Sequence, residues 1–116
     1  MATTTLPQSQ QSTQDVLVPL FHVVLLNDDD HSYDYVVEML QRLFLLSEAQ
    51  AYQHAVEVDT VGRTIVLTAE LPVASFAREQ IQSYGADWRL PESKGSMTAI
   101  LEPATGYSGS GGGHAA

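Results

Sequence analysis

The sequence of 116 residues contains no cysteine, which excludes disulfide bonds, thiolate metal sites and cysteine nucleophiles. Basic residues are scarce: five Lys and Arg stand against 14 Asp and Glu, a formal charge of −9. This charge disfavours nucleic acid or an anionic membrane as the main partner and favours a cationic ligand or a basic protein surface. No apolar run approaches the ~20 residues that span a bilayer, and no secretory signal begins the chain. We therefore expect a cytoplasmic protein that binds neither nucleic acid nor membrane.

Both ends of the sequence are poor in apolar residues. Residues 1–15 are largely Thr, Gln and Ser, and such a segment cannot bury enough surface to offset its chain entropy. Residues 105–116 are rich in Gly and Ser, which is typical of a flexible segment. We predict a disordered N-terminal extension over 1–15, one folded domain over 16–104 and a flexible tail over 105–116.

The middle of the chain alternates between strand-like and helix-like patterns. Runs of apolar and β-branched residues predict strands at 21–26, 63–68 and 97–101. Between them, apolar residues at three- and four-residue steps predict three helices. The order β-α-α-β-α-β predicts an α+β fold, with a small three-stranded antiparallel sheet and three helices packed on one face.

Local signals mark where these helices begin and end. Ser32 is a suitable N-cap for the first helix, and Ser47 with Gln50 fits a capping box for the second. Gly62 can end the second helix in a left-handed conformation. A third helix is predicted to begin near Pro72 and to close at Gly85.

The most distinctive motif follows the first predicted strand. The apolar run over 23–26 stops at Asn27, and Asp28, Asp29 and Asp30 come next. A buried strand would thus deliver a cluster of oxygen acceptors to one spot on the surface. Such a cluster suits a cation, either a metal ion or the ammonium group of a ligand. The plainer interpretation is a polar turn with a helix cap, because Asn and Asp are common turn residues.

Several segments of the chain resemble the ClpS family, the adaptor proteins of ATP-dependent Clp proteases. They are residues 24–29 (VLLNDD), 35–44 (YVVEMLQRLF), 51–62, 68–70 (TAE) and 101–102 (LE). The resemblance implies a protein without catalytic activity that binds N-degron substrates, whose first residue is bulky and apolar. It also implies that these substrates pass to the N-terminal domain of a Clp-type unfoldase. No cofactor is expected.

The resemblance further implies a site for the first residue of the substrate. Asn27, Asp28 and Asp29 would hold the free α-amino group, and the first side chain would enter an apolar pocket beside them. That pocket would be lined by Leu26, His31, Tyr33, Val36, Ala55, Val58 and Met97. Glu70 matches a family position that helps to dock the unfoldase.

The chain departs from the family pattern at several of these positions. Asp59 stands where the family usually has a histidine that accepts a hydrogen bond from the α-amine. Because a carboxylate can accept the same bond, we include Asp59 in the predicted amine site. Tyr33 and Ala55 replace common methionines, which leaves the preferred first residue open. Ser75 replaces a lysine of the unfoldase interface.

Two other functions are open at this point. A ClpS-like regulatory protein could dock the unfoldase around Glu70 while its altered pocket no longer accepts the usual first residues. A metal-binding or hydrolytic protein could instead use the acidic cluster, whose oxygen atoms suit Ca²⁺ or Mg²⁺. Its ligands would be Asp28, Asp29, Asp30, His31 and Asp59. The spacing matches no calcium-loop pattern, and no Ser-His-Asp or zinc constellation is present, so no catalytic residue or metal ligand is predicted.

Overall fold

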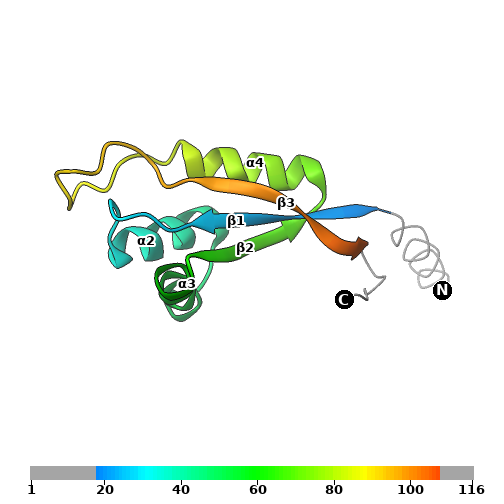
Figure 1. Cartoon of the computed structure of the whole chain (residues 1–116), viewed down its shortest axis with the longest axis horizontal. Coiled ribbons are helices and arrows are strands. Elements are labelled where there is room, and N and C mark those ends of the chain that lie inside the picture. Colours follow the sequence, from blue (N-terminus) through cyan, green and yellow to red (C-terminus); the bar gives the residue numbers. More distant parts are fainter. Residues whose placement is uncertain (1–17, 108–116) are drawn as a thin grey trace, which may run out of the picture.

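The computed structural model describes residues 18–107 and confirms the predicted order of elements (Figure 1). The strands are β1 (Pro19–Leu26), β2 (Arg63–Ala69) and β3 (Ala99–Tyr107). The helices are α2 (Tyr33–Phe44), α3 (Glu48–Val61) and α4 (Leu71–Gln82). The extension predicted for 1–15 lies outside the described residues, as does the tail from residue 108 onward, and the proposed domain boundaries stay a prediction.

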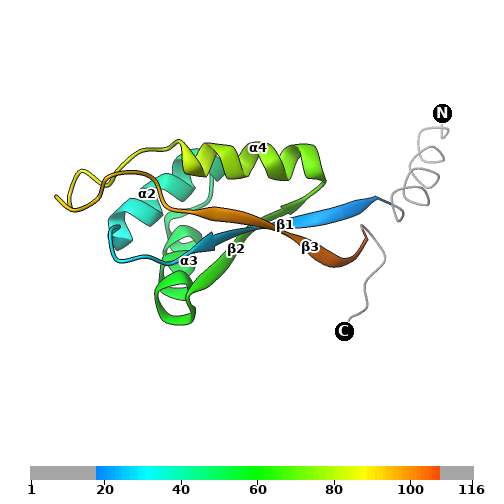
Figure 2. The same cartoon turned by 45° about the horizontal axis from the view of Figure 1, so that its top comes forward.

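The sheet has β1 in its centre, in the order β2-β1-β3, and both pairings are antiparallel. Val23, Val24 and Leu25 on this central strand are completely buried. The three helices pack on one face of the sheet, as predicted (Figure 2). The core between the helices and the sheet includes Tyr35, Met39, Leu40, Ala51, Ala55, Ala74, Ala77 and Ile81.

The predicted helix caps are confirmed. The Ser32 hydroxyl accepts a hydrogen bond from the Tyr35 backbone at the start of α2. Ser47 and Gln50 form both bonds of a capping box at the start of α3. Gly62 ends α3 with a φ of 101°, a left-handed conformation that favours glycine. These caps set the directions of α2 and α3.

Two predicted boundaries were wrong. Helix α4 ends at Gln82 and not at Gly85, because Ser83 caps it and the Tyr84 N–H bonds to the Ile81 carbonyl in a tighter turn. The last strand begins at Ala99 and continues to Tyr107, where it pairs with Pro19 at the start of β1. Residues 105–107, assigned to the tail by their composition, therefore form the end of β3, since pairing with a neighbour overrides weak local propensity.

The segment 83–98 between α4 and β3 is the longest connection in the described part of the chain, and we call it the α4–β3 loop. It lies beside the end of β1 and the start of α2 in both views (Figures 1 and 2). Between residues 18 and 107, no helix is both long enough and apolar enough to cross a bilayer.

Candidate functional site

Four segments meet where β1 ends: the residues after β1, the start of α2, the end of α3 and the α4–β3 loop. Two backbone hydrogen bonds hold the chain there. The Leu26 N–H donates to the Thr98 carbonyl at 3.0 Å, and the Asn27 N–H donates to the Gly62 carbonyl at 3.0 Å. Asn27 is therefore held between the end of α3 and the segment that leads into β3.

A small pocket of about 40 Å³ lies at this meeting point, and we call it the β1-end pocket. It is lined by Asn27, Asp28, His31, Ser32, Tyr33, Val36, Ala55, Val58, Asp59 and Met97. All of these except Ser32 are residues that the sequence assigned to the site. Val36, Ala55, Val58 and Met97 are buried, whereas Asn27 and Asp59 are exposed at the rim. The pocket thus joins an apolar wall to oxygen acceptors.

Three of the predicted site residues do not line the β1-end pocket. Leu26 is half-buried at the end of β1, and the exposed Asp29 lies in the loop after it. Glu70 is the N-cap residue of α4 and follows the far end of β2, where Ala69 pairs with Phe21. Because β1 and β2 are antiparallel, Glu70 and the β1-end pocket lie at opposite ends of the sheet.

Two residues that line the pocket are joined by a hydrogen bond between two helices. The Tyr33 hydroxyl on α2 donates to Oδ2 of Asp59 on α3, with an O–O distance of 2.6 Å. This bond to the carboxylate raises the pKa of the Tyr33 hydroxyl above its usual value of 10.0. Tyr33 and Asp59 both line the pocket, and their bond engages one carboxylate oxygen of the predicted amine site.

His31 connects the acidic loop to the α4–β3 loop. Its Nδ1 lies 2.8 Å from Oδ1 of Asp28, and its Nε2 lies 2.7 Å from the Gly95 carbonyl oxygen. The side chain is only 4 % exposed. The imidazole ring is thus held between a carboxylate and a backbone carbonyl, one at each ring nitrogen. His31 is therefore a wall residue that also orients Asp28.

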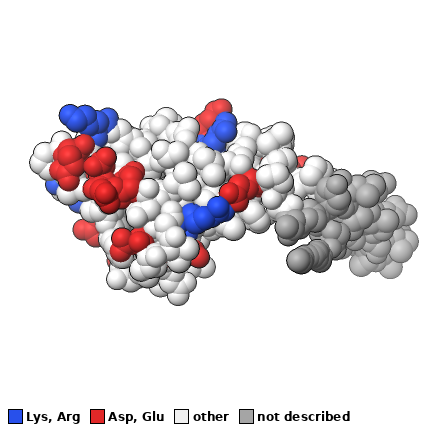
Figure 3. All heavy atoms as spheres, in the orientation of Figure 1, with Lys and Arg blue, Asp and Glu red and all other residues white. Residues whose placement is uncertain are grey.

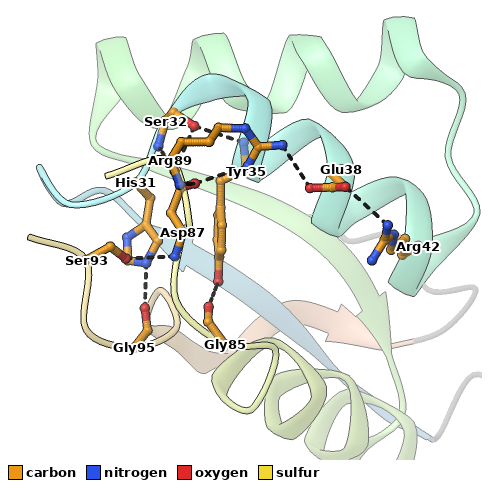
Figure 4. Close-up of polar contacts among 10 residues, drawn as sticks. All are labelled: His31, Ser32, Tyr35, Glu38, Arg42, Gly85, Asp87, Arg89, Ser93 and Gly95. Atoms are coloured by element: carbon orange, nitrogen blue, oxygen red, sulfur yellow. Dashed lines mark hydrogen bonds and ion pairs between the residues drawn. The ribbon is translucent and has the colours of Figure 1, made fainter. Parts of the chain in front are cut away.

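A buried carboxylate that the sequence analysis did not select holds the α4–β3 loop in place (Figure 4). Asp87 is 1 % exposed and accepts two hydrogen bonds at 2.7 Å from Ser32, one from its N–H and one from its hydroxyl. It also accepts bonds at 3.1 Å from the backbone N–H and from Nη1 of Arg89. Burial alone would raise the pKa of Asp87, but these four bonds outweigh it and lower the pKa from 3.8 to about 2.

Further bonds extend this network along α2. Nη2 of Arg89 donates to Oε1 of Glu38 at 3.0 Å, and the Tyr35 hydroxyl donates to the Gly85 carbonyl at 2.6 Å. Figure 4 shows these side chains pointing toward one another between α2 and the loop. The network positions the two walls of the pocket that carry Tyr33 and Met97. The only sequence signal for Asp87 was a single charge in a turn-like segment, which is too common to select it.

The acidic character of this end of the molecule is visible on its surface. Figure 3 shows a group of acidic side chains at the end where β1 runs into α2. Within residues 18–107, however, no three His, Asp or Glu side chains converge in a way that could hold a metal ion.

Comparison with known proteins identifies the family. The model of the ATP-dependent Clp protease adaptor protein ClpS matches residues 18–91. This chain belongs to the ClpS family. The ClpS adapter of Synechococcus sp. is 33% identical over 88 residues, which cover 75% of this chain and 97% of that protein. The predicted family and the role of an adaptor for an ATP-dependent Clp protease are confirmed.

Two other proteins extend the comparison. The E3 ubiquitin-protein ligase UBR1 of Homo sapiens is 36% identical over 64 residues, covering 55% of this chain but 4% of that protein. Agrobacterium tumefaciens ClpS2, solved with L-phenylalaninamide bound, shares the fold with a TM-score of 0.65 and 23% identity. That match covers 74% of this chain and 98% of ClpS2. The order of elements seen here is thus that of a ClpS fold.

Proposed function

We propose that the β1-end pocket binds the free amino terminus of a polypeptide whose first residue is bulky and apolar. The chain then delivers such N-degron substrates to the N-terminal domain of a Clp-type unfoldase and catalyses no reaction itself. The observation that supports this is the meeting of oxygen acceptors and a buried apolar wall in one pocket. The phenylalaninamide bound to A. tumefaciens ClpS2 has both chemical features of such a ligand. The cytoplasmic location expected from the sequence stays a prediction.

The rim of the pocket supplies the acceptors for the amine. A free α-amino group has an ordinary pKa of about 8 and is largely cationic at neutral pH. Asn27 can offer its side-chain carbonyl, and Asp28 and Asp59 can each offer a carboxylate oxygen. Each hydrogen bond to a charged group contributes roughly 1.5–3 kcal/mol in net terms. Asp29 belongs to the proposal only as an exposed neighbour that adds negative charge.

The apolar half of the pocket must open before a large side chain can enter. A volume of about 40 Å³ is far below the roughly 300 Å³ at which pockets begin to enclose small ligands. Rotation of Tyr33 away from Asp59 would widen the pocket and free the Asp59 carboxylate in one step. The small side chain of Ala55 leaves room at the buried end. Burial of a side chain the size of Leu or Phe then contributes about 1.5–3 kcal/mol.

A titration of short fluorescent peptides tests this function. Peptides that begin with Phe, Leu, Trp or Tyr should bind, and the same peptides acetylated at the N-terminus should not, because acetylation removes the cationic amine. Equal binding of both forms, or no binding of either, would show that the amine is not recognised. Glu79→Gln serves as a control variant that changes an exposed acidic side chain on α4 and should bind like the wild type.

A second candidate function is favoured by the small volume of the β1-end pocket. On this view the chain docks the unfoldase but does not bind N-degron substrates. The proposed docking surface lies around Glu70, which is exposed and makes no capping bond, beside the exposed apolar residues Leu71 and Val73. Glu70→Ala should weaken binding to the isolated N-terminal domain of the unfoldase and leave peptide binding unchanged, because the two surfaces lie at opposite ends of the sheet. Docking without any peptide binding would establish the second candidate.

A further inference from the structure

A larger hollow lies beside the β1-end pocket, between α2 and α3, and we call it the interhelical groove. It has a volume of about 460 Å³. Its lining residues are Tyr33, Asp34, Val37, Glu48, Ala49 and Tyr52. Tyr33 lines both the groove and the β1-end pocket, so the two hollows are neighbours separated by one side chain. A polypeptide held at the pocket therefore has the groove within its reach.

The groove combines aromatic rings with carboxylates. The rings of Tyr33 and Tyr52 lie 5.8 Å apart at a tilt of 56°, and Tyr52 is 52% exposed. Asp34 and Glu48 are exposed, and the six residues that line the groove include no Lys or Arg. The helix dipole stabilises acidic residues in the first turn of a helix. This effect accounts for the presence of Asp34 and Glu48 at the starts of α2 and α3. The dipole does not account for an open hollow with a half-exposed tyrosine in its wall.

This combination of groups suits one kind of ligand. A guanidinium group is planar and permanently charged, stacks on aromatic faces and pairs with carboxylates. An ammonium group uses the aromatic face less well and is more strongly hydrated. An acidic side chain would meet two like charges, and a plain apolar side chain would leave both carboxylates without a partner. Charge and shape in the groove therefore favour arginine.

We propose that the interhelical groove is a second subsite, which takes a basic side chain, preferably arginine, from the second or third residue of the bound polypeptide. The proposal rests on the proposed function, because binding of the amino terminus in the β1-end pocket sets where the next residues lie. An extended chain advances about 3.3 Å per residue, so a long side chain from either residue can pass Tyr33. The substrate class would then be polypeptides with a bulky apolar first residue followed closely by arginine.

Fluorescence anisotropy with matched peptides tests the proposal. The peptides begin with a free Phe and carry Arg, Ala or Glu at the second or the third position, at 0.15 M salt. The peptide with Arg should bind about fivefold more tightly than the peptide with Ala, from one cation–π contact and one exposed ion pair. The peptide with Glu should bind more weakly than both. In Tyr52→Ala and Glu48→Gln the gain from Arg should fall below twofold, while the Phe-Ala peptide binds as it does to the wild type.

Glu79→Gln is the matched control, because it removes the same charge from an exposed position on α4, a different helix. It should keep the full gain from Arg. If Glu79→Gln reduces the gain as much as Glu48→Gln does, the preference comes from the net charge of −9 and the subsite is wrong. A full gain in Tyr52→Ala and Glu48→Gln would refute the subsite as well.

The two proposals fail in different ways. If the Phe-Ala peptide binds and Arg does not increase the affinity, the subsite is refuted and the proposed function is retained. If no peptide with a free amine binds to the wild type, both the proposed function and the subsite are refuted.

Discussion

Asp87 offers a quantitative test of how the α4–β3 loop is held. Its pKa of about 2, against an ordinary value of 3.8, measures how much more strongly the folded state stabilises the charged form. At 1.36 kcal/mol for each pH unit between the two values, this amounts to about 2 kcal/mol. Asp87→Asn keeps one acceptor oxygen but replaces the other with an NH₂ group, which then faces the donors of either Ser32 or Arg89. We expect it to lower the free energy of unfolding at pH 7 by about 2 kcal/mol.

The dependence on pH follows from the sign of the shift. A carboxyl whose pKa is lowered by folding stabilises the folded state above its unfolded pKa, and this stabilisation is lost as the pH falls through the folded value. For Asp87 the contribution is complete above about pH 5 and disappears as the pH drops through 3.8 toward 2. Urea unfolding at a series of pH values from 7 to 3 measures it. At pH 7 the midpoint of Asp87→Asn should lie about 1–2 M below that of the wild type, and the gap should narrow at low pH.

A matched control separates the hydrogen bonds of Asp87 from its charge alone. Glu92→Gln removes one negative charge from an exposed position in the same loop and should change the midpoint little. A loss of under about 0.5 kcal/mol in Asp87→Asn at pH 7 would refute the account. A gap that stays constant from pH 7 to pH 3 would refute it too, because the carboxylate would then not be its source.

The other predictions concern the β1-end pocket. Tyr33→Phe keeps the ring but frees the Asp59 carboxylate, and should raise affinity for free-amine peptides severalfold in anisotropy; weaker binding would show that the hydroxyl itself contacts the ligand. Asp59→Asn should weaken the same peptides by about tenfold, the loss of one charged hydrogen bond, and unchanged affinity would assign the amine to Asn27 and Asp28 alone. His31→Ala removes bonds to Asp28 and to the α4–β3 loop. It should lower the unfolding temperature measured by calorimetry by about 8 °C, which corresponds to a loss of roughly 2 kcal/mol in the free energy of unfolding. An unchanged temperature would show that these bonds do not hold the loop.

Most of the fold could be predicted because its signals are local. Ser32, Ser47 with Gln50, and Gly62 each act through hydrogen bonds or backbone angles within a few residues, so their identity in the sequence is sufficient. The end of β3 could not be predicted in this way. Its last residues have weak strand propensity and become a strand because β1 provides a partner for Tyr107 at Pro19.

In the candidate site, too, local features could be predicted from the sequence and contacts between distant segments could not. The acceptors of Asn27 and Asp28 follow directly from a buried strand that ends in polar residues, and the apolar wall was predicted through resemblance to a family. The bond from Tyr33 to Asp59 joins residues 26 positions apart, and Ser32 and Asp87 are 55 positions apart. No local pattern marks such pairs, because their geometry depends on how α2, α3 and the α4–β3 loop pack.

The sequence by itself determined the order of the elements, the helix caps, the acidic group after β1 and the excess of negative charge, since each depends on residue type or on near neighbours. The tertiary structure alone decided that the β1-end pocket is small, that Asp87 holds the loop beside it and that a groove with two tyrosines lies next to it. These features arise where side chains from distant segments meet, and their volumes and hydrogen bonds exist only once the chain has packed.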